Sequence, residues 1–439
     1  MKRALYLFIT LVAINLLTRC IGEGSNQNRD KIISPPNTIE IIEKPVVNVY
    51  IENSASMDGY VKGITEFEQA VYSYLSGIKI SDVTDTLNLY YINSSPISYA
   101  ANADIDVISD FIEKLEPTTF RQRGGNRSTT DISNVFKAIL AETRENDVAI
   151  LVTDGIFSPG RGKDAAEYLV NQQIGVKNTI AEYLKKYPNT AIVVYQLSSK
   201  FTSNATEKIY YYNREDKPIE VNAQRPYYIW IIGNVANITL LKANIPETTF
   251  KGGGVQHSFT FLPSLEKEID YAILNTPKFG SFKRDKKSSK TSIYDIKKAK
   301  SGIQQGKFMF TIGMDLSLFS ILLGDEYLLN TESYARLINK QPNNDYFIEM
   351  EDNTNPLTNY THNMKLTADK ISVGELEIIL RNNLPVWVSE INDDEGLDIH
   401  INNAINKTFG IKYLVEGIYE AYQRQENTIY TTMKFNLKK

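Results

Sequence analysis

Three short segments of the chain carry hydroxyl and carboxylate side chains in a pattern that could bind a metal ion. The run ENSAS contains Glu52, Ser54 and Ser56 and directly follows a β-branched and aromatic stretch. Thr130 precedes a helix-like segment, and Asp154 comes at the end of the apolar run VAILVT. Hydroxyl and carboxylate oxygens are the ligands that Mg²⁺ and Mn²⁺ prefer, with several coordination sites left to water. The three segments therefore predict a divalent-metal site, provided that the fold brings them together.

Alternating strands and helices are predicted around these segments. The runs VVNVYIE, TLNLYYIN, VAILVT, TAIVVYQLSS and YYIWIIGN are typical of strands, and VAILV has the continuous apolar character of a central strand covered on both faces. Helical spacing of apolar residues occupies 64–78, 132–140 and 164–186. This alternation predicts an α/β fold with a doubly wound, mostly parallel, Rossmann-like sheet over residues 45–250. Ligands bind at the carboxyl ends of the strands in such sheets, so the three segments would meet there.

Two further parts of the chain depart from this alternation. Residues 200–226 form a connection longer than most in a compact domain, which indicates either an excursion or a small hairpin. The run KGGG at 251–254 marks a plausible boundary. Beyond it, residues 255–439 contain short strand-like runs such as GKFMFTIGM and TIYTTMKFNL, together with one helical pattern over 411–422. These features predict a β-rich C-terminal domain of sandwich type.

The three polar segments resemble the metal-ion-dependent adhesion site of von Willebrand factor A domains. That family has DxSxS after its first strand, a threonine before a helix and an aspartate, often within TDG, after a later strand. The resemblance covers about residues 45–245 and implies a Mg²⁺ or Mn²⁺ ion. It implies that Ser54 and Ser56 bind the metal directly, Thr130 directly or through water, and Asp154 and Glu52 mainly through water. It also implies a protein partner that places an acidic side chain on the metal.

One position departs from the family, because Glu52 stands where the family has aspartate. The additional methylene moves the carboxylate by about one bond length, so Glu52 could bind the metal directly, occupy the position of a partner's carboxylate, or disrupt the site. Asp58 adds another carboxylate nearby.

Each residue of the predicted site also has an ordinary structural interpretation. Thr130 could cap the following helix. Ser54 and Ser56 could bond to their own loop backbone, and Asp154 could close a tight turn. Their joint occurrence, in the order that the family has, favours metal binding.

The N-terminal residues have the pattern of an export signal. Two basic residues precede an uncharged apolar run over residues 4–17, which is shorter than a membrane span. The only cysteine, Cys20, follows in LTRC, which resembles the lipobox of bacterial lipoproteins, although Arg19 replaces the usual small residue. This resemblance implies a lipid on Cys20, and an incidental buried cysteine is the alternative. We therefore expect a lipoprotein-type signal peptide at 1–20, a polar linker at 21–44 and a membrane-anchored, extracytoplasmic protein of the cell envelope.

Composition and the remaining motifs narrow the function. A formal net charge of -4 gives no basic field for nucleic acid. The three histidines, His257, His362 and His400, are too isolated to predict a zinc site or a serine–histidine pair. The acidic cluster NDDEGLD at 392–398 lacks the spacing of a calcium-binding EF-hand loop, so a solvated turn is the better interpretation.

The predicted function is a non-enzymatic binding protein that recognises a protein partner through the metal. Two alternatives remain open. The same metal, with Glu52 or Asp154, could activate water in a hydrolase. A metal-free scaffold within an envelope assembly is the second alternative, and the replacement of aspartate by Glu52 is the feature that hints at it.

Overall fold

The computed structural model describes residues 44–125, 127, 131–263, 268–284, 290–354, 358–423 and 429–439. Residues Lys44–Lys439 form one compact unit. The predicted export signal with Cys20, the linker up to residue 43 and the predicted metal ligand Thr130 lie outside the described residues. Among the residues that are described, no helix is both long and apolar enough to cross a membrane.

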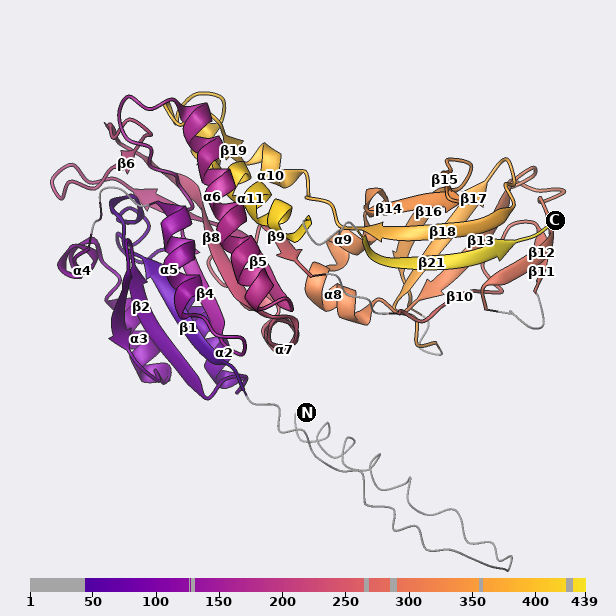
Figure 1. The fold of residues 1–439 in the computed structure, drawn as a ribbon, viewed down its shortest axis with the longest axis horizontal. Coiled ribbons are helices and arrows are strands. Elements are labelled where there is room, and N and C mark those ends of the chain that lie inside the picture. Colours follow the sequence, from indigo (N-terminus) through magenta and orange to yellow (C-terminus); the bar gives the residue numbers. More distant parts are fainter. Residues whose placement is uncertain are drawn as a thin grey trace, which may run out of the picture. The chain divides into compact units, whose positions relative to one another are not determined.

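Seven strands form the central sheet of the α/β part (Figure 1). They are β1 (Val46–Glu52), β2 (Thr86–Ile92), β3 (Pro96–Ala100), β4 (Val148–Thr153), β5 (Thr190–Thr202), β8 (Asn222–Asn234) and β9 (His257–Phe261). Their order across the sheet is β3-β2-β1-β4-β8-β5-β9. Strand β1 is parallel to both β2 and β4, and the other four neighbouring pairs are antiparallel. Strands β1, β2, β4 and β5 therefore share one direction.

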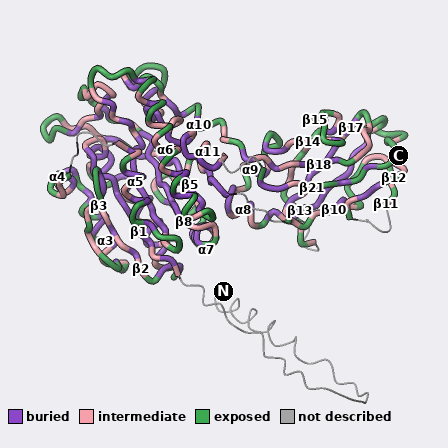
Figure 2. Tube along the Cα trace, viewed as in Figure 1, coloured by how far each residue is buried: buried purple, intermediate pink, exposed green. Residues whose placement is uncertain are grey.

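The central strands are buried because their side chains alternate between two apolar cores. In β1, Val49 and Ile51 belong to one core and Tyr50 to the other. In β4, Ile150 and Leu151 likewise point to opposite cores. Figure 2 shows these strands as buried, apart from Val46 at the start of β1. The prediction of a central strand covered on both faces is thus confirmed for β4.

Helices contribute to both cores, so both faces of the sheet are covered. Residues of α2 (Glu66–Ile80), α3 (Ile105–Glu113) and α7 (Val235–Asn244) lie in the core of Val49. Residues of α5 (Ile132–Glu142), α6 (Ala165–Lys186) and α11 (Ile411–Gln423) lie in the core of Tyr50. The remaining helical segments of this part are η1 (Ala55–Met57), α4 (Pro117–Gln122), η2 (Glu247–Thr249), α10 (Trp387–Glu390) and η4 (Ala404–Asn406). The predicted α/β class is confirmed.

The connection over residues 200–226 proves to contain a small hairpin. Strands β5 and β8 pair antiparallel along their whole length, from Thr190 opposite Asn234 to Thr202 opposite Asn222. Between them, β6 (Tyr211–Tyr212) and β7 (Pro218–Ile219) form a short antiparallel pair. The sequence did not predict that an antiparallel strand, β8, lies between β4 and β5. The long hairpin of β5 and β8 accounts for this position.

The C-terminal part contains two larger sheets. The first has the order β10-β13-β17-β16 and the second β11-β12-β21-β18-β14-β15. Apolar side chains from both, such as Phe310 of β13 and Ile378 of β18, share one buried cluster. The strands are β10 (Tyr271–Ile273), β11 (Ser281–Arg284), β12 (Ser292–Lys297), β13 (Phe308–Met314), β14 (Tyr334–Ile338), β15 (Gln341–Pro342), β16 (Phe347–Asp352), β17 (His362–Ala368), β18 (Gly374–Arg381) and β21 (Ile429–Leu437).

Two segments beyond the predicted boundary pack with the α/β part. Strand β9 pairs with β5 in the seven-stranded sheet, and α11 lies against α6. Gly417 of α11 makes this contact close, because an added Cβ would lie 2.7 Å from the Gln173 carbonyl oxygen. The remaining short elements are α8 (Ser317–Leu323), α9 (Asp325–Leu329), η3 (Thr331–Ser333), β19 (Asn392–Asp393) and β20 (Thr408–Phe409).

Candidate metal centre

The ends of β1 and β4 bring four of the five predicted metal ligands to one edge of the sheet. These strands are parallel neighbours with Ile51 opposite Val152, so both end at the same edge. Glu52 is the last residue of β1, and Asp154 directly follows β4. Ser54 directly precedes the short helix η1, which contains Ser56. The fifth predicted ligand, Thr130, lies outside the described residues.

Ser54, Ser56 and Asp154 form the polar centre of this edge. The Ser54 and Ser56 hydroxyl oxygens lie 2.9 Å apart. Asp154 is 1% exposed, and its Oδ1 accepts a hydrogen bond of 3.2 Å from the Ile156 amide. Its Oδ2 is buried and has no hydrogen-bond partner among the described residues. Burial raises the pKa of Asp154, and a hydrogen bond from Ser56 opposes this shift. An unpartnered buried carboxylate oxygen is costly and indicates an unfilled interaction.

Glu52 points its carboxylate toward the end of β4. The side chain is buried, and its Oε2 accepts a hydrogen bond from the Thr153 hydroxyl. The same hydroxyl accepts a hydrogen bond of 2.9 Å from the Gly155 amide. Gly155 has a φ of +67°, which favours glycine in the turn that follows β4. The longer side chain of Glu52 is therefore held by contacts between the two strands.

Asp58 forms ion pairs with two arginines and does not lie among the predicted metal ligands. Its Oδ1 lies 2.5 Å from Arg127 Nη2, and its Oδ2 lies 3.3 Å from Arg121 Nη2. Arg127 also donates to the backbone carbonyls of Asn53, at 2.7 Å, and Ser54, at 3.1 Å. Arg127 thus holds the loop that carries the two serines. This role of Arg127 was not predicted, although the sequence contains the basic run RQRGGNR.

A second arginine that was not predicted to belong to the site, Arg225 of β8, lies buried near Asp154. It is 1% exposed, and its Nη1 donates to the Ile405 carbonyl at 2.9 Å. Its guanidinium lies 4.6 Å from the centre of the Tyr211 ring. The positive charge of Arg225 acts to lower the pKa of Asp154, against the larger effect of burial. The only local signal was an arginine directly before the apolar run PYYIWII.

An open groove of about 820 Å³ begins beside these loops. It starts at Asn93, whose side chain donates to Asn53 Oδ1 at 3.0 Å. The groove continues past Asn134 and Lys137 of α5 to Lys163, just before α6. Neither lysine forms an ion pair with a described residue. The groove is therefore a polar surface that carries two lysines and one carboxylate, Asp131, and Lys163 lies 5.4 Å from the centre of the Tyr168 ring.

The histidines and the acidic cluster lie elsewhere in the fold. His257 stacks on Trp387 with ring centres 5.3 Å apart, His362 is buried beside Thr361, and His400 is exposed. Asp393 accepts hydrogen bonds from the backbone amides of residues 395 and 396, which confirms the predicted turn. Within the described part of the chain, His, Cys, Asp and Glu side chains form no group of three that could hold a metal.

The candidate centre differs from such a group because two of its predicted ligands are serines. Two adjacent hydroxyls, one unpartnered carboxylate oxygen and a second buried carboxylate fit a small cation that prefers oxygen. The chain matches no family model, and neither curated proteins nor solved structures gave a match.

Proposed function

We propose that the chain is an exported, lipid-anchored binding protein of the cell envelope, which recognises a protein partner through Mg²⁺ or Mn²⁺ at a von Willebrand factor A-like site. The observation that carries the proposal is Asp154 Oδ2, which is buried and unpartnered among the described residues beside the paired hydroxyls of Ser54 and Ser56. A cation between these groups would satisfy the carboxylate. The lipid on Cys20 would hold the protein at the membrane.

The residues of the site have separate tasks in this proposal. Ser54 and Ser56 supply neutral oxygens, and Asp154 supplies negative charge. Glu52, which accepts a hydrogen bond from Thr153, would orient a water molecule on the metal. Arg127 keeps the serine loop in position through the carbonyls of residues 53 and 54. The bound metal would supply an open coordination position for a carboxylate of the partner.

The groove that starts at Asn93 supports an acidic partner. Lys137 and Lys163 line it together with one carboxylate, Asp131, and neither lysine forms an ion pair with a described residue. A partner that places one carboxylate on the metal and further acidic side chains along the groove would match these charges. Such charge complementarity chiefly increases the association rate and the specificity, and it weakens as salt rises.

Calorimetric titration of Mg²⁺ and Mn²⁺ into the detergent-solubilised full chain tests the metal site. We expect about one ion per chain, and loss of that binding in Ser54→Ala/Ser56→Ala. The matched control is Ser73→Ala/Ser76→Ala in α2, where both hydroxyls bond to backbone carbonyls instead. Circular dichroism checks that both double variants fold. Absence of binding by the native chain, or equal loss in the control variant, would contradict the proposal.

A metal-free scaffold is a second candidate, and Arg225 is the observation that favours it. A buried guanidinium already supplies positive charge to Asp154. Arg225→Met separates the two functions. In a metal site, loss of this repulsive charge should tighten Mg²⁺ binding, by about tenfold for each 1.4 kcal/mol of repulsion removed. In a metal-free scaffold, the variant should lose stability that Mg²⁺ does not restore.

A further inference from the structure

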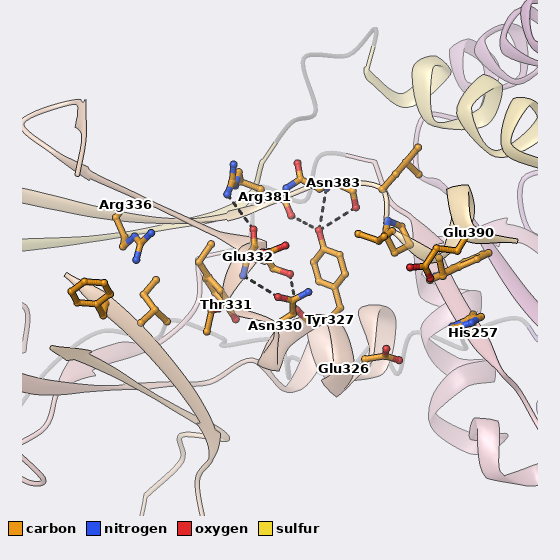
Figure 3. A pocket seen from close by; sticks show the side chains of 18 residues that line it. His257, Glu326, Tyr327, Asn330, Thr331, Glu332, Arg336, Arg381, Asn383 and Glu390 are labelled. Atoms are coloured by element: carbon orange, nitrogen blue, oxygen red, sulfur yellow. Dashed lines mark hydrogen bonds between the residues drawn. The ribbon is translucent and has the colours of Figure 1, made fainter. Parts of the chain in front are cut away.

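A second concave surface, independent of the metal site, lies in the C-terminal half of the sequence (Figure 3). It is an open groove of about 780 Å³, within the usual size of small-molecule sites. Figure 3 shows Arg336, Arg381 and Glu332 at one end of this groove, with His257 and Glu390 at the other. The end with the two arginines brings two positively charged side chains to one part of the groove.

Arg336 occupies a position where an apolar residue would be expected. It lies on β14 between Tyr334 and Ile338, both buried, and the two-residue period of a strand places all three on the same face. Its Nη1 donates to the Tyr346 carbonyl at 2.8 Å, which fixes the guanidinium. Its Nε is buried and has no hydrogen-bond partner among the described residues.

Arg381 reaches the same end of the groove from the neighbouring strand β18. The pairing register with β21 shifts between Leu380 and Arg381, and such irregularities re-aim side chains. Arg381 Nη2 donates to the Glu332 carbonyl at 3.1 Å, and the Arg381 carbonyl accepts a hydrogen bond of 2.6 Å from the Tyr327 hydroxyl. Its Nε is also buried without a partner among the residues described.

The two guanidiniums repel each other, and the described residues supply no counter-ion to either. Neither has a described carboxylate oxygen within 4.0 Å, although Glu332 also lines the groove. Burial lowers the pKa of Arg336, and the charge of Arg381 adds to this effect. Two half-buried like charges, each anchored through one nitrogen with further donors free, are costly unless an anion neutralises them.

We propose that Arg336 and Arg381 bind the carboxylate or phosphate group of a small ligand. Planar guanidiniums match the oxygen geometry of both groups, and binding would neutralise the pair. The ring of Phe347, which is 63% exposed, offers an apolar surface to the body of the ligand. Glu326, Glu332 and Glu390 also line the groove and would repel a polyanion. The site therefore selects a ligand with one anionic group and an apolar or aromatic body.

Titration calorimetry on the full chain at constant ionic strength tests this inference. The probes are phenyl phosphate and benzoate, with benzamide as the uncharged control. We expect saturable binding of one or both anions at one per chain, and no binding of benzamide. If phenyl phosphate alone binds, the anionic group of the ligand is a phosphate. If benzoate alone binds, that group is a carboxylate. Failure of both anions to bind, or equal binding of benzamide, overturns the proposal.

Substitutions place the binding at the arginine pair. Arg336→Gln and Arg381→Gln should each weaken anion binding at least tenfold. Arg284→Gln is the matched control, because Arg284 is also half-buried, donates to a backbone carbonyl, has a buried unpartnered Nε and lies outside this groove. Equal weakening in the control overturns the assignment.

Thermal denaturation of the native chain also tests the proposal, and it applies even if a glutamine variant does not fold. The anion that binds should raise the melting temperature of the native chain and of Arg284→Gln equally, and benzamide should raise neither. Absence of that rise in the native chain overturns the proposal. Neither result depends on the metal site.

Discussion

Replacement of Arg127 by methionine should destabilise the fold through the serine loop of the candidate metal centre. The Arg127 side chain is 15% exposed and forms an ion pair of 2.5 Å with Asp58, whose side chain is 4% exposed. Its guanidinium also holds the carbonyls of Asn53 and Ser54. Methionine keeps most of the apolar stem but removes all three interactions. The variant therefore leaves the buried Asp58 carboxylate with the more distant Arg121 as its remaining ion-pair partner.

The structure sets the expected magnitude of this loss. Removing one partner of a buried ion pair costs about 3–5 kcal/mol. Arg121 remains 3.3 Å from Asp58, but its side chain is 37% exposed, so it retains only about 1 kcal/mol of compensation. We expect Arg127→Met to lower the free energy of unfolding by about 3 kcal/mol. Asp58→Asn should cost less, because burial already raises the pKa of Asp58 and makes its charge expensive.

Urea unfolding of the single and double variants measures this coupling. The double variant Asp58→Asn/Arg127→Met should be more stable than the sum of the single effects predicts, by about 1–3 kcal/mol. Arg123→Met is the control from the same segment, because Arg123 lies over the Tyr91 and Tyr99 rings instead. Additive effects of the two substitutions, or a loss in Arg127→Met no larger than in Arg123→Met, would refute the reasoning.

Two further predictions concern a buried carboxyl group and a helix contact. Burial, with a smaller contribution from the charge of Glu116, raises the pKa of Glu68 to about 7. The contribution of this carboxyl group to the free energy of unfolding is therefore fully present below its unfolded pKa of about 4.3. That contribution is lost as the pH rises toward 7. Glu68→Gln can keep the hydrogen bond from the Thr65 amide. Its free energy of unfolding should equal that of the native protein at pH 4 and exceed it by about 1 kcal/mol at pH 8, a value discounted for partial exposure. Identical urea-unfolding curves of the two proteins at both pH values would contradict this. Gly417→Ala should lower the unfolding free energy by about 1–3 kcal/mol, because the new Cβ would lie 2.7 Å from the Gln173 carbonyl and force α11 away from α6. An unchanged melting temperature in calorimetry would show that α11 does not make this contact.

Local pattern was sufficient for the elements that carry the candidate site. The continuous apolar run of β4 predicts a strand buried on both faces, and the structure has it at Val148–Thr153. The helical pattern at 164–186 corresponds to α6, Ala165–Lys186, which Asp164 caps. Ile64 shows the limit of spacing alone, since it fits the helical period but precedes the capping residue of α2 and is 91% exposed.

Strand direction and long-range charge pairs could not be predicted in the same way. A buried strand has the same residue pattern whether its neighbours are parallel or antiparallel, so the insertion of β8 between β4 and β5 depends on the hairpin and not on composition. The Arg127–Asp58 pair joins residues 69 positions apart, and Arg225 contacts a carbonyl 180 positions away. Such contacts leave no periodic signal in a single sequence.

The charges around the candidate centre bear on how a metal would behave there. Glu52, Asp58 and Asp154 are buried carboxylates, and Arg121, Arg127 and Arg225 supply three positive charges close to them. This near balance gives a divalent cation little net negative charge, so the chain alone should bind Mg²⁺ weakly. A carboxylate from an acidic partner would add the missing charge, and by linkage the metal and the partner would then strengthen each other's binding. Under the proposed function, the chain alone therefore binds Mg²⁺ weakly but measurably, and an Mg²⁺ affinity that an acidic partner leaves unchanged would contradict this account.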